Sequence, residues 1–222
     1  MMDAFLDISA KAGIAVTIAD KLIGSCCGQI FGSKGFGEAY RYIANRIVEQ
    51  LWVSSLEGVV PVVMDISSCT YTLHHLRPVL TDENRVKFDK LVIMDSVDYL
   101  HDVVIPVCKA GVKKGNIVLH PVCSLQKMGT DHKFRKVAET FAERVTVPLH
   151  AGCCGMAGDR GFLFPELTEA ATAAEAAEVK GVARPYDGYY SSTRTCEMAM
   201  SEAVQQNYAS ILYLVNECMV MG

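Results

Sequence analysis

The amino-acid sequence predicts an α/β fold in which mainly parallel strands alternate with helices. Short apolar runs that are typical of strands are separated along the chain by longer segments with apolar residues at helical spacing. Parallel strands need long crossover connections, and helices usually supply them. Half of the 222 residues are apolar, so the chain can bury both faces of such a sheet.

The predicted strands are the short apolar runs at 13–18, 59–64, 91–94, 116–119 and 145–149. Apolar side chains recur at helical spacing over 36–51 and again over 134–141, which indicates two helices with one buried face each. The stretch 166–179 is rich in Ala and Glu and follows Pro165, so we expect a helix that begins after this proline. A final, largely buried helix is expected over 208–219.

A motif of two adjacent cysteines and a glycine occurs twice, and an isolated cysteine follows it each time. From the second cysteine of the pair to the isolated one is 42 positions in both copies (69 minus 27 and 196 minus 154). A pattern that repeats in register indicates an internal duplication. We therefore expect two pseudo-equivalent repeats, over 1–112 and 113–222. The residues are Cys26, Cys27 and Cys69 in the first copy and Cys153, Cys154 and Cys196 in the second.

Cys123 follows the predicted strand at 116–119 and lies 30 positions before the second pair (153 minus 123). Its counterpart in the first repeat would precede residue 1. The first repeat is therefore expected to lack its opening strand and one cysteine. On this interpretation the sequence is either a piece of a longer polypeptide or a natural truncation.

The pattern of the nine cysteines favours metal ligands or redox groups over disulfides. Their number is odd, adjacent cysteines rarely form a relaxed disulfide, and no signal peptide is recognised at the N-terminus. Several of them follow predicted strands, whose carboxyl ends share one edge of a parallel sheet. Four thiolates complete the ligand set of a [4Fe–4S] cluster. The predicted cluster ligands are Cys123, Cys153, Cys154 and Cys196, and the further predicted metal ligands are Cys26, Cys27 and Cys69.

Zinc also accepts four thiolates and stays open as an alternative, as does a purely structural role for buried cysteines. Two adjacent and two distant ligands suit a cluster of several metal atoms better than one tetrahedral ion. Glycines beside each pair are expected to let the backbone approach a bulky inorganic group. His120 and His150 are interpreted either as contacts of the cysteine ligands or as structural hydrogen-bonding groups. Cys108 and Cys218 fall outside the pattern and are expected in the core.

Four stretches carry a resemblance to a known family: LHPVC at 119–123, AGCCGMAGDRGF at 151–162, PELT at 165–168 and SSTRTCE at 191–197. The doubled pattern resembles the cysteine-rich (CCG) domain found in heterodisulfide reductases and in the iron–sulfur component of glycolate oxidase. The finer match, which covers nearly the whole chain, resembles the C-terminal region of bacterial FAD-linked, iron–sulfur D-lactate dehydrogenases.

The resemblance implies an oxidoreductase whose FAD lies on an absent N-terminal region and oxidises a 2-hydroxy acid. Electrons would pass through ferredoxin-like domains and the cluster to a quinone or another acceptor. No catalytic residue is expected in this stretch, and alone it is not expected to oxidise the hydroxy acid. The implied location is the cytoplasm, with the longer enzyme at the inner face of the membrane.

Two departures from the family weaken disulfide chemistry and favour plain electron transfer. Ile66 and Thr193 stand where the family pattern has the first cysteine of a Cys-x-x-Cys pair, so Cys69 and Cys196 are alone. A thiol/disulfide oxidoreductase component like that of heterodisulfide reductase remains open, as does a zinc-stabilised, non-catalytic assembly module.

Charge and hydropathy exclude two classes of partner. The net charge is −4 and no basic stripe is present, so nucleic acid is not an expected partner. The longest uncharged apolar runs are far shorter than the roughly 18 residues of a membrane span.

Overall fold

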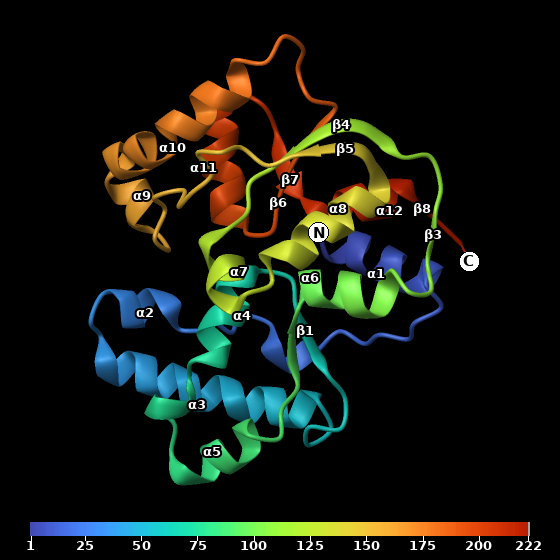
Figure 1. Cartoon of the computed structure of the whole chain (residues 1–222). Coiled ribbons are helices and arrows are strands. Elements are labelled where there is room, and N and C mark those ends of the chain that lie inside the picture. Colours follow the sequence, from blue (N-terminus) through green and yellow to red (C-terminus); the bar gives the residue numbers. More distant parts are fainter. Residues whose placement is uncertain (222) are drawn as a thin grey trace. The chain divides into compact units, whose positions relative to one another are not determined.

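The structure is a computed structural model that describes residues 1–221, with residue 21 described by its backbone alone. Contacts between residues divide the chain into two compact units. The larger unit contains Met1–Val16 and the chain from Val97 onward, and the smaller unit is Thr17–Ser96. Figure 1 shows the elements of both units.

The larger unit is built on a sheet of four parallel strands, in the order β5-β4-β6-β7. The central pair has Ile117 opposite Gly188 and Leu119 opposite Tyr190. The prediction of a parallel sheet with helices on its faces is confirmed. The strands are β4 (Lys114–Leu119), β5 (Ala142–Thr146), β6 (Gly188–Ser191) and β7 (Tyr208–Ser210).

Helices connect the strands in crossovers. The bounds are α7 (Cys123–Met128) and α8 (Asp131–Phe141) between β4 and β5, α9 (Arg160–Leu163) and α10 (Pro165–Lys180) between β5 and β6, α11 (Arg194–Val204) between β6 and β7, and α12 (Ile211–Cys218) after β7. Because such crossovers are right-handed, the step from β4 to β5 and the step back to β6 use opposite faces of the sheet. Accordingly α8 packs against α12, and α10 packs against α11 (Figure 1).

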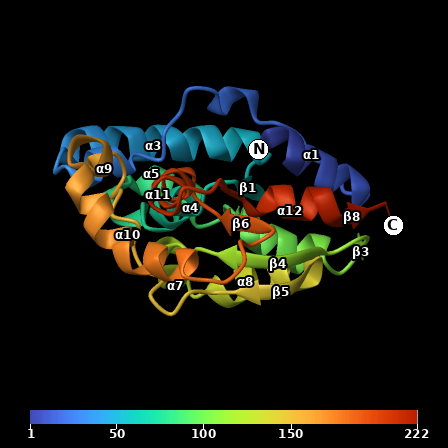
Figure 2. The same ribbon diagram turned by 90° about the horizontal axis from the view of Figure 1, so that it is seen from above.

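The larger unit also contains elements outside the sheet. They are α1 (Met2–Lys11), which packs against α12, the π-helical turn η3 (Tyr99–Val104), and the antiparallel pair β3 (Lys109–Ala110) and β8 (Met219–Val220). Figure 2 shows α1 beside α12 from a second direction. The short helix α6 (Ser96–Asp98) leads into η3.

The smaller unit pairs two short parallel strands and packs helices against them. Its elements are η1 (Asp20–Leu22), α2 (Gln29–Ser33), α3 (Gly37–Ser54), β1 (Val62–Met64), α4 (Ser67–His74), η2 (Arg77–Val79), α5 (Asp82–Phe88) and β2 (Ile93–Asp95). Its core joins one face of α3 to α4 and η2, and Cys27 belongs to that core. Among the described residues of both units, no helix has the length and apolarity needed to cross a membrane.

Most predicted elements are present, but the prediction of a strand at 13–18 is wrong. This stretch is irregular and largely exposed, and it pairs with no strand that the structure describes. The strand predicted at 145–149 lies earlier, at Ala142–Thr146, and it includes the exposed Glu143. It is an edge strand, where charged side chains are tolerated, so apolar composition was a poor guide to its start.

Two strands of the four-stranded sheet, β6 and β7, were not predicted, and neither was the short pair β3 and β8. β6 has only four residues, and β7 occupies the start of the stretch expected as the final helix, which begins instead at Ile211. Ser210 caps that helix, since its side chain accepts a hydrogen bond from the Leu212 amide.

The same local elements recur after a shift of 127 positions (153 minus 26). When 127 is added to each residue number, α3 corresponds to α10, β1 to the end of β6, and the start of α4 to the start of α11. The compact units divide the chain at other places than residue 112, since α1 and η3 belong to the unit that holds the second cysteine motif. The repeat limits 1–112 and 113–222 therefore stay a prediction from sequence.

Candidate functional site

Four cysteines of the larger unit lie at the carboxyl edge of its sheet, in three different connections. Cys123 is the first residue of α7 after β4, and Cys153 and Cys154 lie in the loop after β5. Cys196 lies in the first turn of α11, after β6. The connections that leave the neighbouring strands β4 and β6 run to opposite faces of the sheet. A crevice opens at such a switch point, and it is the usual ligand site of open α/β sheets.

The four thiols form two hydrogen-bonded pairs. The sulfurs of Cys154 and Cys196 lie 2.9 Å apart, and both residues are buried. The Cys123 thiol bonds to Cys153, which is exposed. The charges of the other three cysteines also act on Cys196. The fold therefore brings together all four residues that the sequence predicted as cluster ligands.

Each pair holds one thiol that ionises easily and one that does not. A hydrogen bond from Cys123 lowers the pKa of Cys153 to about 5, and one from Cys196 lowers the pKa of Cys154 to about 7. The same bonds, together with burial, raise the pKa values of Cys123 and Cys196 above the usual range. Thiolates are the form of cysteine that binds metals and attacks disulfides, so two of the four thiols are prepared for either chemistry.

Backbone amides also stabilise the adjacent cysteines. Cys153 accepts a hydrogen bond from the Gly155 backbone, and Cys154 accepts one from Met156. In the smaller unit, the Gly28 amide donates to the Cys26 sulfur over 3.3 Å. Such N–H groups aimed at sulfur are a feature of iron–sulfur sites, where they tune the potential.

The glycine of each motif is needed for packing against a helix. This requirement is separate from the expected approach of the backbone to an inorganic group. Gly155 has a positive φ of 76°, and a Cβ there would lie 2.6 Å from the Leu167 carbonyl oxygen on α10. Gly28, with φ of 85°, would place a Cβ 3.1 Å from Tyr40 on α3. The glycine thus lets the cysteine loop pack closely against the long helix that follows.

The first motif forms a smaller version of the same arrangement. The sulfurs of Cys27 and Cys69 lie 3.4 Å apart, and the hydrogen bond between them lowers the pKa of Cys27 to about 6. Cys26 is exposed and Cys27 is buried, as are their counterparts Cys153 and Cys154. This site has three thiols, because no residue of the chain corresponds to Cys123.

A buried histidine–glutamate pair lies close in the chain to the first of the four cysteines. His120 directly follows β4, and its Nδ1 lies 2.9 Å from both carboxylate oxygens of Glu175 on α10. The two side chains are 1% and 2% exposed. After the thiol and backbone hydrogen bonds, an electrostatic interaction with the His120 side chain also lowers the pKa of Cys153 and of Cys154. Of the two interpretations of His120, the structure shows the hydrogen-bonded core group, and a contact with the cysteine ligands stays a prediction.

His150 is exposed and is paired with an acid of α10. Its side chain is 63% exposed and bonds Glu178 on α10 over 2.9 Å. Glu178 also accepts hydrogen bonds from the Leu149 and His150 amides, and these bonds lower its pKa. The hydrogen bonds of Glu178 therefore connect the start of the cysteine loop to α10.

Sequence reasoning missed Glu175, although a signal was present. Thr168, Thr172, Glu175, Ala176 and Val179 are the buried residues of α10 and share one helical face. A glutamate at a position of the apolar stripe is a buried acid that needs a partner. Cys218 is buried at the end of α12, whereas Cys108 is only half-buried and lies in the irregular segment before β3.

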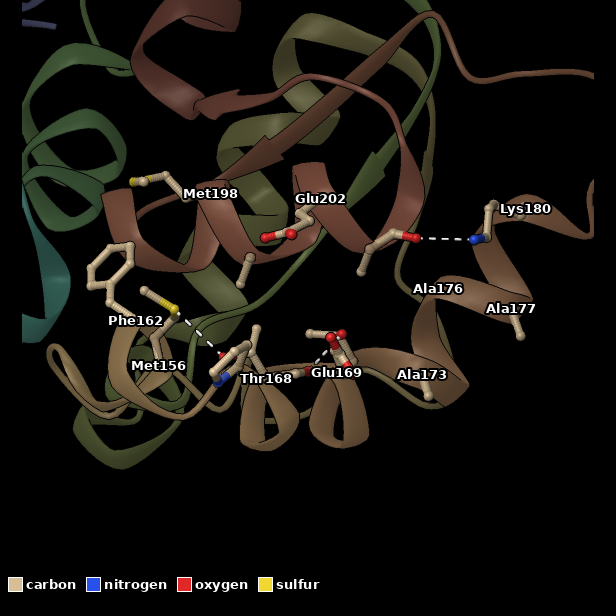
Figure 3. Close-up of a pocket in the computed structure, with 15 residues that line it drawn as sticks. Met156, Phe162, Thr168, Glu169, Ala173, Ala176, Ala177, Lys180, Met198 and Glu202 are labelled. Atoms are coloured by element: carbon tan, nitrogen blue, oxygen red, sulfur yellow. Dashed lines mark hydrogen bonds between the residues drawn. The ribbon is translucent and has the colours of Figure 1, made fainter.

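A pocket of about 540 Å³ lies between α10 and α11, next to the cysteine loop (Figure 3). Met156, two residues after Cys154, lines one end and accepts a 3.6 Å hydrogen bond from Thr168. At the other end Lys180 donates to the Ala203 carbonyl. The alanines along both helices make the walls, and no cysteine lines the pocket. It is therefore separate from the thiol site.

Four thiols are a suitable ligand set for a metal centre, but their sulfur atoms are not at metal-binding distances from one another in this structure. Among the described residues, no three His, Cys, Asp or Glu side chains are arranged to hold a metal ion. The 2.9 Å contact of Cys154 and Cys196 is shorter than the about 3.8 Å that separates two thiolates on a tetrahedral zinc ion with bonds of about 2.3 Å. The chemistry of the donors does fit, since four free thiols from three connections meet at one edge.

Comparison with protein-family models and with curated proteins finds no match.

Proposed function

We propose that the chain is the electron-transfer part of a longer flavin-dependent 2-hydroxy acid dehydrogenase, with a [4Fe–4S] cluster on Cys123, Cys153, Cys154 and Cys196. One observation carries the proposal: these four free thiols meet at the topological switch point of a parallel sheet. A cluster at this place would relay single electrons between a donor and an acceptor.

The residues around the thiols support a metal role over simple packing. A buried cysteine alone is usually a small apolar core residue. Here Cys153 and Cys154 instead accept backbone hydrogen bonds, and the motif places one thiol of each pair in a form that ionises readily. These features hold negative sulfur at the edge of the sheet, which a metal centre needs and a packed core does not.

The partners in this proposal are the parts of the longer enzyme and its acceptor. FAD and ferredoxin-like domains on the absent region would supply electrons, and a quinone or another acceptor would receive them. The enzyme would work in the cytoplasm, at the inner membrane face. The three thiols Cys26, Cys27 and Cys69 would form a second metal site that needs a further ligand from outside this chain.

A second candidate, thiol–disulfide chemistry, is favoured by the contact of Cys154 and Cys196. Two thiols at 2.9 Å, one of them with a pKa of about 7, are placed to form a disulfide with little movement. Both residues are buried, however, so a protein or large disulfide substrate has poor access to them. For this reason electron transfer through a metal centre is the preferred function.

The test is the metal and acid-labile sulfide content of protein reconstituted anaerobically with iron and sulfide, together with an EPR spectrum. We expect about four irons and four sulfides for the second site, and a signal that appears on reduction. The variant Cys154→Ser should lose both, while the matched control Cys108→Ser should keep them. Zinc alone without a redox signal would make the chain an assembly module, and no metal at all would favour thiol–disulfide chemistry.

A further inference from the structure

His120 is held in place by hydrogen bonds to its backbone and to its ring. Its backbone amide bonds the Tyr190 carbonyl, and its own carbonyl accepts from the Ser191 hydroxyl, so the residue is fixed between β4 and β6. On the other side, Nδ1 meets both oxygens of Glu175 at 2.9 Å. An ionised carboxylate only accepts hydrogen bonds, so Nδ1 carries the proton.

The second ring nitrogen of His120 has no such partner. Nε2 is buried and has no hydrogen-bond partner among the residues that the structure describes. Leaving a buried polar atom unsatisfied costs free energy, and native proteins rarely do so without a reason. With the proton on Nδ1 held by Glu175, Nε2 presents a bare lone pair.

This arrangement is the one in which histidines bind metals. A metal-ligating histidine almost always donates its other ring N–H to a carboxylate or a carbonyl, which fixes the tautomer and raises the basicity of the ligating nitrogen. His120 has that carboxylate, and it lies three residues before Cys123 at the switch point. It directly follows β4, at the same edge of the sheet as the four thiols.

We propose that His120 Nε2 is a nitrogen donor to the metal centre of the four cysteines, and that Glu175 is the residue that positions it. This inference rests on the proposed function. Because four thiolates already give each iron of a [4Fe–4S] cluster one protein ligand, His120 would be a fifth protein ligand, added at one iron.

The first cysteine motif supports the assignment by contrast. The shift of 127 positions relates Glu175 to Val48, which is fully buried on α3 at the corresponding place. An apolar residue therefore satisfies the fold at this position. The buried His–Glu pair accompanies the four-thiol site and is not required by the helix packing alone.

The test is to look for nitrogen on the bound metal directly. Protein labelled with [15N]histidine is reconstituted anaerobically with iron and sulfide, reduced, and examined by pulsed EPR; X-ray absorption at the metal edge serves for a zinc-loaded sample. We expect coupling to one histidine nitrogen, or one nitrogen neighbour beside sulfur. The signal should vanish in the double variant His120→Leu/Glu175→Leu, and it should persist in His150→Leu, which changes a histidine outside the site.

The positioning role of Glu175 has a separate readout. In Glu175→Gln the nitrogen signal should remain but the apparent metal affinity should fall about 10- to 100-fold, as for other carboxylates behind ligating histidines. Circular dichroism of each variant checks that the fold is retained.

The outcomes separate this inference from the proposed function. Bound metal with sulfur as its sole protein donor, or a nitrogen signal that survives the double variant, would overturn the role of His120 and leave the electron-transfer proposal standing. Protein that takes up no metal would overturn both.

Discussion

Cys154 and Cys196 are 42 positions apart in the chain, yet their sulfurs lie 2.9 Å apart. The same relation recurs in the smaller unit, where Cys27 and Cys69 are separated by 42 positions and 3.4 Å. In each unit the second cysteine of the adjacent pair meets the isolated cysteine, which lies on a helix after a parallel strand. The duplication seen in the sequence is therefore matched by a duplicated thiol contact.

Oxidation of the metal-free protein should join these contacts. With the small oxidant diamide, which takes up the two hydrogens, we expect disulfides Cys154–Cys196 and Cys27–Cys69, because little movement brings these sulfurs to the bond length of about 2.05 Å. Mass spectrometry of a proteolytic digest measures the products. Cys218, which is buried at the end of α12, should stay reduced. A disulfide between Cys153 and Cys154 as the main product would contradict the prediction.

The exposed Cys153 should be the most reactive thiol of the four at mildly acidic pH. Its pKa is lowered to about 5, so in reduced, metal-free protein it is largely thiolate at pH 6, whereas burial raises the pKa of the control Cys108. Alkylation by iodoacetamide, followed by peptide mass spectrometry, should label Cys153 first and slow as the pH falls below 5. The variant Cys123→Ala removes the main cause of the shift and should move this pH dependence to higher values. Equal labelling of Cys153 and Cys108 at pH 6 would argue against the thiol pair.

Gly155→Ala should destabilise the larger unit more than the matched change Gly158→Ala. Both glycines have positive φ, which costs an alanine roughly 1–2 kcal/mol. Only at Gly155 would the new Cβ also meet backbone, 2.6 Å from the Leu167 oxygen, so we expect a further loss of about 1–3 kcal/mol. Urea unfolding measures the difference. Equal losses would mean that the loop moves away from α10 without cost.

Replacing one member of the pair His120–Glu175 should lower the free energy of unfolding more than replacing both. Glu175→Leu or His120→Leu alone leaves one buried polar group without its partner and should lower the free energy of unfolding by about 3–5 kcal/mol. The double variant should regain most of this loss, because two apolar side chains of similar size need no partner. A double-mutant cycle by denaturant unfolding gives the coupling energy, and additive losses would show that the pair does not act as a unit.

Lys133 on α8 should stabilise the larger unit in a pH-dependent way. It bonds Asp98 and Asp102 over 2.8 and 2.6 Å, and its bond lowers the pKa of Asp102. A lowered carboxyl pKa adds stability above the unfolded value of about 3.9, and this stability is lost as the pH falls through the folded value. Lys133→Met should therefore cost about 1 kcal/mol at pH 7 and less at pH 3. On the same helix, Lys136→Met, which removes an exposed bond to Glu139, should change little.

The sequence was sufficient for the features that depend on local pattern. Pro165 at the first position of α10 and the apolar stripe of α8 follow from residue spacing alone. The spacing of the two cysteine motifs also predicted which residues meet. It did so because a strand followed by a short loop and a helix is a local unit, and each cysteine lies at a fixed place within it.

Only the tertiary structure decided the contacts between elements that are distant in the chain. The order β5-β4-β6-β7 sets the switch point, and no local pattern orders the strands of a sheet, because the partners of a strand lie outside its own sequence. For the same reason β5, a charged edge strand, was misplaced. Glu175 shows this most clearly: its helix was predicted, but only the packing of α10 on the sheet brings it to His120 and makes a buried pair of two residues 55 positions apart.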